Sequence, residues 1–444
     1  MDIYLPPWVA RCVEALEQAG FAAYAVGGCV RDACLNRVPN DYDLCTQALP
    51  EQTQQVFRDR KLVLAGLKHG TVGVITEGGV VEITTFRSEG SYADGRHPDW
   101  VRFVDQIDQD LSRRDFTVNA MAWSPSRGLA DPFGGREDLQ KGILRAVGDP
   151  EQRFREDALR ILRGLRFAAR FHLEIEENTL AAMEKTGPLM DCLARERVFE
   201  ELNQLLPLAG RDGLIKSASI LACAIPEISP MIGFDQRNPH HAYDLYTHTA
   251  WVVSQVPADP VLRWAALLHD VGKVATFTLD DQQCGHFYGH DQMGGDMADA
   301  ILRRLKAPTA LREQAVTLIK NHMNPLPDSR KALRRRISRL GWELTEKLWH
   351  LQRADLCSKG LCVNQELQRF QRVYQEIEEI RREDSCLSLR DLQVDGNDLK
   401  ALGLSGKAIG NTLNALFSQV LDEQLPNSRE ALLEQVKKSL ETTQ

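Results

Sequence analysis

Two aspartates separated by a single tyrosine, Asp41 and Asp43, follow a pair of glycines in the stretch AVGGCVRDACLNRVPNDYDLCT. On a strand, residues at positions i and i+2 point to the same face, which would place the two carboxylates side by side. Neighbouring carboxylates repel each other unless a cation lies between them, and oxygen ligands of this kind suit Mg²⁺, which also binds nucleotide phosphates. Asp41 and Asp43 are therefore candidate catalytic residues and Mg²⁺ ligands.

The glycines and the arginine of the same stretch suggest a phosphate site. Gly28 would let the backbone approach a phosphate closely, and the free N–H groups of a following helix would attract the anion. Arg31, one turn further on, could reach the same phosphate. Glu82 in VVEITTF is a candidate third carboxylate from a neighbouring strand, with a cross-strand contact as the alternative. Together these residues predict the phosphate and metal chemistry of nucleotidyl transfer.

The elements that must position these residues change in type along the chain. The stretches FAAYAV, DYDLCT, GTVGVIT, VVEITTF and VRFV have the composition of strands, and VARCVEALEQAG before them has helical apolar spacing that ends at Gly20. From about residue 149 onward, long amphipathic stretches such as EDALRILRGLRFAARF dominate. The predicted fold class is α+β, with a small mixed head followed by an elongated, all-α body.

Bulk properties limit the class of protein. The chain has 444 residues, 43% hydrophobic and 26% charged, with a formal net charge of −8, which is typical of a multidomain globular protein. No apolar run approaches a membrane span, and the first twenty residues have no signal-peptide pattern. The ten cysteines include no CxxC pair, which favours reduced thiols. We expect a cytoplasmic protein with no membrane partner.

Several motifs follow the first stretch in a fixed order: SRRDFTVNAMAW, DPFGGREDL, FREDALRILRGLRFAARF and ARERVFEEL. In this series the chain resembles the class II tRNA nucleotidyltransferases, which comprise the bacterial CCA-adding enzymes and the related poly(A) polymerases. The resemblance implies a polymerase-beta-like head that uses Mg²⁺. It implies addition of CCA from CTP and ATP, with the 3′ end and acceptor arm of tRNA as the partner. A poly(A) polymerase or an enzyme that adds only A is the alternative.

The EDALR stretch carries a specific expectation about the base of the incoming nucleotide, which this motif binds in the family. Asp157 and Arg160 are i and i+3, a spacing that would place them on one helix face. A carboxylate only accepts hydrogen bonds, whereas a guanidinium only donates them. Cytosine and adenine both present an amino donor beside a ring-nitrogen acceptor, whereas uracil and guanine reverse that order. The pair should therefore accept C and A and reject U and G.

Further nucleotide contacts are implied by the resemblance alone. Arg114, Arg163 and Arg166 match positions that contact the nucleotide in the family, whereas Asp115 and Asn119 would organise the site. The stretch TFRSEGSYADGRHPDWVRF resembles the flexible loop that the family uses in switching from C to A addition. Its full length argues against an enzyme that adds only CC.

A second ordered series lies in the body: YDLYTHTAW, ALLHDVGKVATF, GHFYGHDQMGG, NHMNPL and LQRADLCSKG. An apolar helix rarely buries a pair such as His269 and Asp270 without a partner. With His248 and Asp355, the series resembles the HD phosphohydrolase domain, whose H…HD…D set binds a divalent metal. His290 and His322 match histidines that hold a second metal in some members of that family. This implies a divalent transition metal and hydrolysis of a phosphomonoester or a 2′,3′-cyclic phosphate, with a structural relic as the alternative.

Breaks that contain proline divide the chain into four expected parts. These are a catalytic head (1–148), a helical neck that selects the base (149–235), an HD-type domain (236–380) and a tRNA-binding tail (381–444). In the tail, GLSGKAIG would place Lys407 against RNA phosphates or would form a plain helix joint. The basic stretch RKALRRRISR is either a solvated helix face or a patch that contacts the tRNA backbone.

Overall fold

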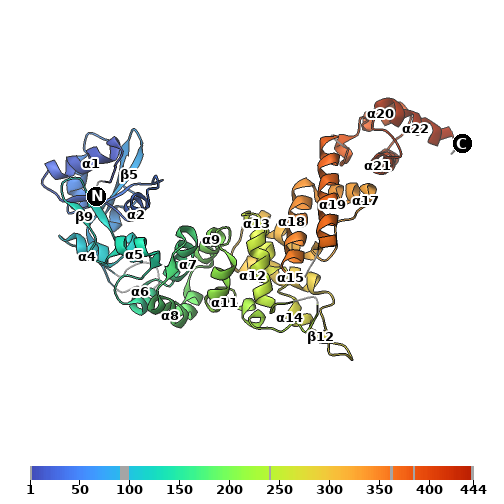
Figure 1. The fold of residues 1–444 in the computed structure, drawn as a ribbon. Coiled ribbons are helices and arrows are strands. Elements are labelled where there is room, and N and C mark those ends of the chain that lie inside the picture. Colours follow the sequence, from blue (N-terminus) through green and yellow to red (C-terminus); the bar gives the residue numbers. More distant parts are fainter. Residues whose placement is uncertain (1–2, 91–99, 240–241, 361–363, 384–385, 442–444) are drawn as a thin grey trace. The chain divides into compact units, whose positions relative to one another are not determined.

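The computed structural model describes residues 3–90, 100–239, 242–360, 364–383 and 386–441. The chain forms two compact units, residues 1–229 and 230–444, which are considered separately below (Figure 1). None of the helices in the described ranges is both long enough and apolar enough to cross a membrane. The predicted division into four parts remains a prediction.

The first unit is built on a seven-stranded sheet in the order β3-β4-β5-β2-β1-β8-β9. The strands are β1 (Ala23–Val26), β2 (Asp43–Thr46), β3 (Leu62–Val63), β4 (Thr71–Thr76), β5 (Gly79–Thr85), β8 (Ala122–Ser124) and β9 (Gly128–Ala130). β2 and β5 run parallel, and the other neighbouring pairs are antiparallel. The expected mixed sheet is therefore confirmed. A separate antiparallel pair joins β6 (Arg87–Glu89) to β7 (Val101–Phe103).

Helices connect and cover this sheet. α1 (Pro7–Gln18) buries Val9, Val13 and Leu16, which recur at helical spacing, and the chain leaves it through Gly20 at φ +87°. α2 (Gly28–Cys34) starts directly after β1, and α3 (Pro50–Val56) follows β2. The sequence therefore indicated both the first helix and the place where it ends.

A series of short helices completes the first unit. They are α4 (Ile107–Ser112), α5 (Gly135–Lys141), α6 (Pro150–Glu156), α7 (Leu159–Phe171), α8 (Glu177–Thr186), α9 (Arg195–Leu205), α10 (Arg211–Lys216) and α11 (Ala218–Ala224). α7 packs on α9 and touches the parallel pair β10 (Ile143–Leu144) and β11 (Glu174–Ile175). A Cβ atom at Gly164 of α7 would lie 2.3 Å from the side chain of Met183 and 2.8 Å from Phe116. Glycine therefore permits the close packing of α7.

The second unit is mainly helical. Its helices are α12 (Leu245–Gln255), α13 (Pro260–Leu268), α14 (Lys273–Thr276), α15 (His290–Arg304), α16 (Thr309–Asn321), α17 (Arg330–Leu340), α18 (Trp342–Cys357), α19 (Asn364–Arg382), α20 (Gly396–Ala401), α21 (Lys407–Leu421) and α22 (Arg429–Glu441). α12, α13, α16 and α18 pack on one another. A short hairpin of β12 (Thr278–Leu279) and β13 (Gly285–His286) interrupts the helices. The expectation of an all-α body from about residue 149 onward is therefore wrong at this hairpin and at β11 of the first unit.

The basic residues of α17 are used within the protein. The Nε atom of Arg334 donates a hydrogen bond to the carbonyl of Leu421, at the end of α21, at 2.9 Å. Arg335 binds both carboxylate oxygens of Asp422 at 2.7 Å, and Arg330 forms ion pairs that include Glu376. The positive charges of Arg334 and Arg335 lie at the C-terminal end of α21, where the helix dipole is negative and a cation is stabilising. These contacts give RKALRRRISR a role that neither of its two interpretations included, because they attach the tail to α17.

Candidate active site and candidate metal centre

Asp43 is the first residue of β2, and its Cα partner on the parallel strand β5 is Glu82. Between Asp41 and Asp43, the side chain of Tyr42 is buried and meets Trp8 edge to face at 5.5 Å. Asp41 and Tyr42 precede the strand, yet both aspartates are exposed on either side of the buried Tyr42, and the charge of Asp41 also raises the pKa of Asp43. Partial burial, and then the charge of Glu82, raise the pKa of Asp43. The carboxylates of Asp41, Asp43 and Glu82 therefore lie close together at the edge of the sheet where β2 begins. A cation bound there would relieve their repulsion.

A cavity of about 400 Å³ opens beside this edge. It brings together seven of the predicted residues: Gly28, Arg31, Asp43, Arg114, Asp157, Arg160 and Arg163. Asp41 and Arg166 are not among its lining residues. Residues 91–99 of the predicted switching loop, which include DGRHP, lie outside the described residues.

Gly27 makes the turn into α2, and Gly28 is the first residue of that helix. Gly27 has φ +74°, and a Cβ atom there would lie 2.8 Å from the guanidinium of Arg114. Arg31 donates a hydrogen bond of 2.6 Å to the side-chain oxygen of Asn119 and is also bound by Asp32. The absence of a side chain at Gly27 therefore leaves space for Arg114, and hydrogen bonds hold Arg31 at the wall of the cavity.

The buried carboxylate of Asp115 pairs with the half-buried Arg163 at the wall of the cavity. The Nε and Nη2 atoms of Arg163 donate to one carboxylate oxygen of Asp115 at 3.0 and 2.7 Å, and Asn119 donates to the other at 3.0 Å. Burial alone would raise the pKa of Asp115, but Arg163 and Asn119 outweigh burial and lower it to about 2. Asp115 and Asn119 thus organise their neighbours, which matches the role expected for them.

The helix-face argument for Asp157 and Arg160 is wrong. Asp157 has φ −145° and ψ +102° and lies in the break between α6 and α7, so it belongs to neither helix. Both side chains nevertheless line the same cavity. Arg160 is 8% exposed and donates to the carboxylate of Glu156 at 3.0 Å and to the carbonyl of Arg113 at 3.1 Å. The prediction that Asp157 and Arg160 lie close together is therefore correct, but they do not share a helix face.

Arg166 lies elsewhere, although it was predicted as a nucleotide contact. It is 8% exposed, and its Nε atom donates to Glu201 of α9 at 2.7 Å. Its guanidinium also lies over the ring of Phe167. These contacts join α7 to α9, so we leave Arg166 out of the proposed site. Sequence reasoning missed Arg197 of ARERVFEEL, which lines the cavity and pairs with Asp157 at 3.2 Å.

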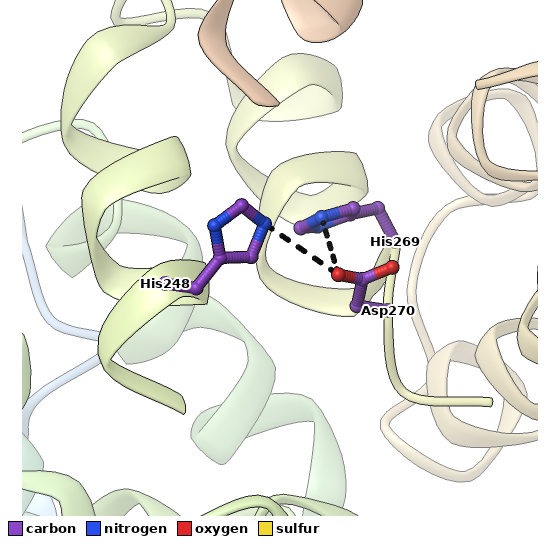
Figure 2. A group of neighbouring side chains, drawn as sticks. All are labelled: His248, His269 and Asp270. Atoms are coloured by element: carbon purple, nitrogen blue, oxygen red, sulfur yellow. Dashed lines mark ion pairs between the residues drawn. The ribbon is translucent and has the colours of Figure 1, made fainter. Parts of the chain in front are cut away.

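The second unit contains the other predicted cluster, part of which Figure 2 shows. The Nε2 atom of His248 lies 3.5 Å from Asp270 and 3.1 Å from Asp355, and that of His269 lies 3.1 Å from Asp270. α13 ends at Leu268, so His269 and Asp270 follow the helix instead of lying inside it, as the sequence had suggested. All four predicted residues thus meet in one place, and groups of them have atoms close enough to share a metal ion.

Two further histidines complete this cluster. The Nε2 atoms of His290 and His322 lie 3.4 and 3.7 Å from the second carboxylate oxygen of Asp270. A Cβ atom at Gly272 would lie 2.5 Å from the carbonyl oxygen of His290, so glycine lets the HDVGK turn approach α15. The close approach brings His290 and His269 to the same carboxylate.

Each of the four histidines His248, His269, His290 and His322 has its Nδ1 atom 2.6–3.2 Å from a backbone carbonyl oxygen. A carbonyl only accepts, so the proton lies on Nδ1 and the Nε2 lone pair faces the aspartates. Nε2 of His269, His290 and His322 has no hydrogen-bond partner among the described residues. Lone pairs that face a carboxylate repel it, and a divalent cation between them would relieve the repulsion.

The cluster forms one wall of a cavity of about 230 Å³. Lys273 lies 2.8 Å from Asp270, and Lys359 lies 3.5 Å from Asp355; both lysines line the cavity. The site therefore combines candidate metal ligands with cations that could bind a small anion.

Family models match three segments of the chain. The Poly A polymerase head domain matches residues 23–145, and the probable RNA and SrmB-binding site of polymerase A matches residues 172–208. A putative domain 2 of tRNA nucleotidyltransferase matches residues 290–436. The matched segments therefore lie in both units.

Curated relatives extend the match to nearly the whole chain. The CCA-adding enzyme of Streptococcus mutans is 32% identical over 435 residues, 97% of this chain and 96% of that protein. The enzyme of Streptococcus thermophilus is 48% identical over 206 residues, 46% of this chain and only 51% of its own length. The crystal structure of the Bacillus stearothermophilus CCA-adding enzyme in complex with CTP has a TM-score of 0.70 at 25% identity and covers 99% of both chains. The chain belongs to the family of CCA-adding enzymes, the class II tRNA nucleotidyltransferases.

Proposed function

We propose that this chain adds the 3′-terminal CCA to tRNA, with CTP and ATP as substrates. One observation carries the proposal: a single cavity is lined by Asp43 at its metal-binding edge and by Asp157 and Arg160 of the base-selecting segment. The relatives named CCA-adding enzyme and the relative solved with CTP support the same activity. The polymerase and RNA-binding family models support RNA as the acceptor.

The carboxylates at the edge of the sheet fit a divalent cation. Asp41, Asp43 and Glu82 are the residues that would hold Mg²⁺ in this proposal, since burial and then the charges of Glu82 and Asp41 raise the pKa of Asp43. When bound, the metal would supply charge stabilisation for the attacked phosphate and for the departing pyrophosphate. The sequence expectation for these ligands thus becomes part of the proposal.

The protein's own residues bind and orient the nucleotide. Arg31, Arg114 and Arg163 line the cavity and place positive charge where a triphosphate would lie. The carboxylate of Asp157 would accept a hydrogen bond from the amino group of cytosine or adenine. Uracil and guanine would bring an acceptor against the same carboxylate, which costs binding because both groups lack a donor.

Stepwise extension tests the proposal. The protein is incubated with Mg²⁺ and with tRNA that ends before the first C, after one C or after CC, and each nucleotide is supplied separately. We expect C on the first two substrates and a single A on the third. Continued A addition would support a poly(A) polymerase, and addition to the third substrate alone would support an A-adding enzyme. The absence of any incorporation would refute nucleotidyl transfer.

We also propose a second function, metal-dependent phosphohydrolysis in the second unit. The Nε2 lone pairs of His269, His290 and His322 that face Asp270 favour it over a structural relic, because an apolar core would avoid this arrangement. His248, His269, Asp270 and Asp355 would hold a divalent transition metal, and His290 and His322 would hold a second one. Lys273 and Lys359 would orient a phosphomonoester or a 2′,3′-cyclic phosphate in the cavity.

Release of phosphate tests the second function. Wild type is assayed with phosphomonoesters and 2′,3′-cyclic nucleotides in the presence of Mn²⁺, Co²⁺ or Ni²⁺. His269→Ala removes a buried ligand, whereas the control His350→Ala changes a histidine of α18 outside the cluster. Hydrolysis that His269→Ala abolishes and His350→Ala retains would support the proposal. Equal activity in both variants, or none in wild type with any metal, would favour the structural alternative.

A further inference from the structure

The face of α9 that packs on α7 carries two charged residues, one turn apart, that bind the base-selecting segment. Arg197 pairs with Asp157 at 3.2 Å, and Glu201 binds Arg166 at 2.7 Å. The second pair is buried and joins the two helices away from the cavity, whereas Arg197 is a cavity-lining residue. Within the motif ARERVFEEL, Glu201 therefore makes a packing contact between helices, and Arg197 makes a contact with the site.

The carboxylate of Asp157 is held from two sides. One oxygen accepts a hydrogen bond of 3.0 Å from the backbone N–H of Leu159, at the start of α7. The other oxygen accepts a hydrogen bond of 3.2 Å from the Nη2 atom of Arg197. Asp157 itself lies outside both neighbouring helices, so these two bonds, rather than a regular helix, fix the direction of the carboxylate.

The other arginines near Asp157 are bound to different partners. Arg160 donates to Glu156 and to the carbonyls of Arg153 and Arg113, and Arg163 binds Asp115. Among the described residues, Arg197 is thus the arginine that forms an ion pair with Asp157. The side chains of Asp157 and Arg197 are 15% and 22% exposed, so water shields the pair only in part.

We propose that Arg197 is a positioning residue for base selection. It holds one oxygen of Asp157 and thereby keeps the remaining acceptor positions of the carboxylate directed at the amino group of cytosine or adenine. This inference rests on the proposed function of the same cavity. Arg197 acts through Asp157, so its loss relaxes the choice of nucleotide more than it slows the transfer step.

The test compares variants of two arginines on the same helix. Arg197→Ala removes the contact with Asp157, Arg197→Lys keeps a positive charge, and Arg195→Ala removes an arginine that pairs with Asp191 at 3.2 Å. For each, kcat and KM are measured for CTP and UTP on tRNA that lacks CCA. We expect Arg197→Ala to lower the CTP-over-UTP ratio of kcat/KM on the order of tenfold, mainly through a higher KM for CTP. Arg197→Lys should restore part of the ratio, and Arg195→Ala should match wild type.

Asp157→Asn provides the background that separates positioning from a general structural effect. If Arg197 acts through Asp157, Arg197→Ala in the Asp157→Asn background should leave the CTP-over-UTP ratio unchanged. An unchanged ratio in the single variant Arg197→Ala would overturn the inference, as would an equal additional loss in both backgrounds. Should Arg197→Ala fail to fold, the same criteria apply to Arg197→Met, which keeps most of the side-chain volume and removes the hydrogen-bond donors. A wild-type protein that transfers no nucleotide would instead refute the proposed function.

Discussion

The two candidate sites treat buried charge in opposite ways. In the first unit, the buried carboxylates of Asp115 and Glu201 bind the guanidinium groups of Arg163 and Arg166, so the protein itself supplies the opposite charge. In the second unit, the Nε2 atoms of His269, His290 and His322 face the carboxylate of Asp270 and have no hydrogen-bond partner among the described residues. In the first unit, protein cations balance the charge of the buried carboxylates. In the second unit, a bound cation would be needed to offset the repulsion between the histidine lone pairs and the carboxylate.

This difference indicates what each site is built to do. The paired residues of the first unit hold a cavity in shape, and the reactive carboxylates lie at its exposed edge, where substrate and metal can enter together. The ligands of the second unit are buried before any substrate arrives. We therefore expect the metal of the second unit to contribute to stability, and the metal of the first unit to contribute to catalysis alone.

The largest expected effect is on catalysis in the first unit. Asp43→Asn removes a carboxylate from the exposed sheet edge and should lower nucleotidyl transfer by about 10²–10³-fold, since several kcal/mol of charge stabilisation are lost. The measurement is single-nucleotide incorporation into tRNA at saturating CTP. Thermal stability and any phosphate release by the second unit should stay at the wild-type level. If transfer survived in Asp43→Asn, the metal edge would be misassigned.

A smaller effect is expected on stability in the second unit. Metal present at about a hundred times its Kd stabilises a folded protein by about 2.7 kcal/mol. Wild type should therefore unfold at a higher temperature with bound metal than after chelation, and His269→Ala should lose this difference. Metal content and unfolding temperature are measured on the same samples, and nucleotidyl transfer with added Mg²⁺ is the internal control. Equal metal content in wild type and His269→Ala would contradict the contrast between the sites.

The ion pairs of the first unit predict a pH dependence of modest size. The pKa of Asp115 falls from 3.8 to about 2 on folding, so the ionised carboxylate stabilises the protein at pH values above about 4. That contribution of about 2 kcal/mol is lost as the pH falls through about 2. In denaturant titrations, the free-energy difference between wild type and Asp115→Asn should shrink by this amount between pH 5 and the lowest accessible pH. A constant difference would show that Asp115 gains nothing from its partners.

The sequence predicted much of the fold because local signals agreed with it. The strands β1, β2, β4, β5 and β7 and the mixed sheet lie where the apolar patterns placed them, but Asp41 precedes β2, so strand spacing does not account for the position of both aspartates. Long-range pairing was not accessible in this way. Nothing in the spacing of Arg166 or Arg197 indicated that one would bind Glu201 and the other Asp157, because those contacts depend on how α9 packs on α7.

The metal-ligand cluster shows the same limit from the other side. Its residues were recognised from their order along the chain, yet the proton positions that make them ligands depend on four backbone carbonyls contributed by separate turns and helix ends. The assumed helix around His269 was wrong for a related reason, since the turn at Gly272 is required by the close approach of α15. Tertiary packing determines the histidine proton positions and the end of α13, and a local sequence pattern does not predict such packing.

The central claim is that one cavity of the first unit both transfers the nucleotide and selects its base, and substitution of Asp157 tests this claim most directly. Asp157→Asn replaces an acceptor by a side chain that both accepts and donates, so uracil gains a partner that Asp157 denies it. With tRNA that lacks CCA, the ratio of kcat/KM for CTP over UTP should fall by about 10²-fold, while total incorporation remains measurable. If Asp157→Asn kept the wild-type preference for CTP, base choice would lie elsewhere and this account of the cavity would be refuted.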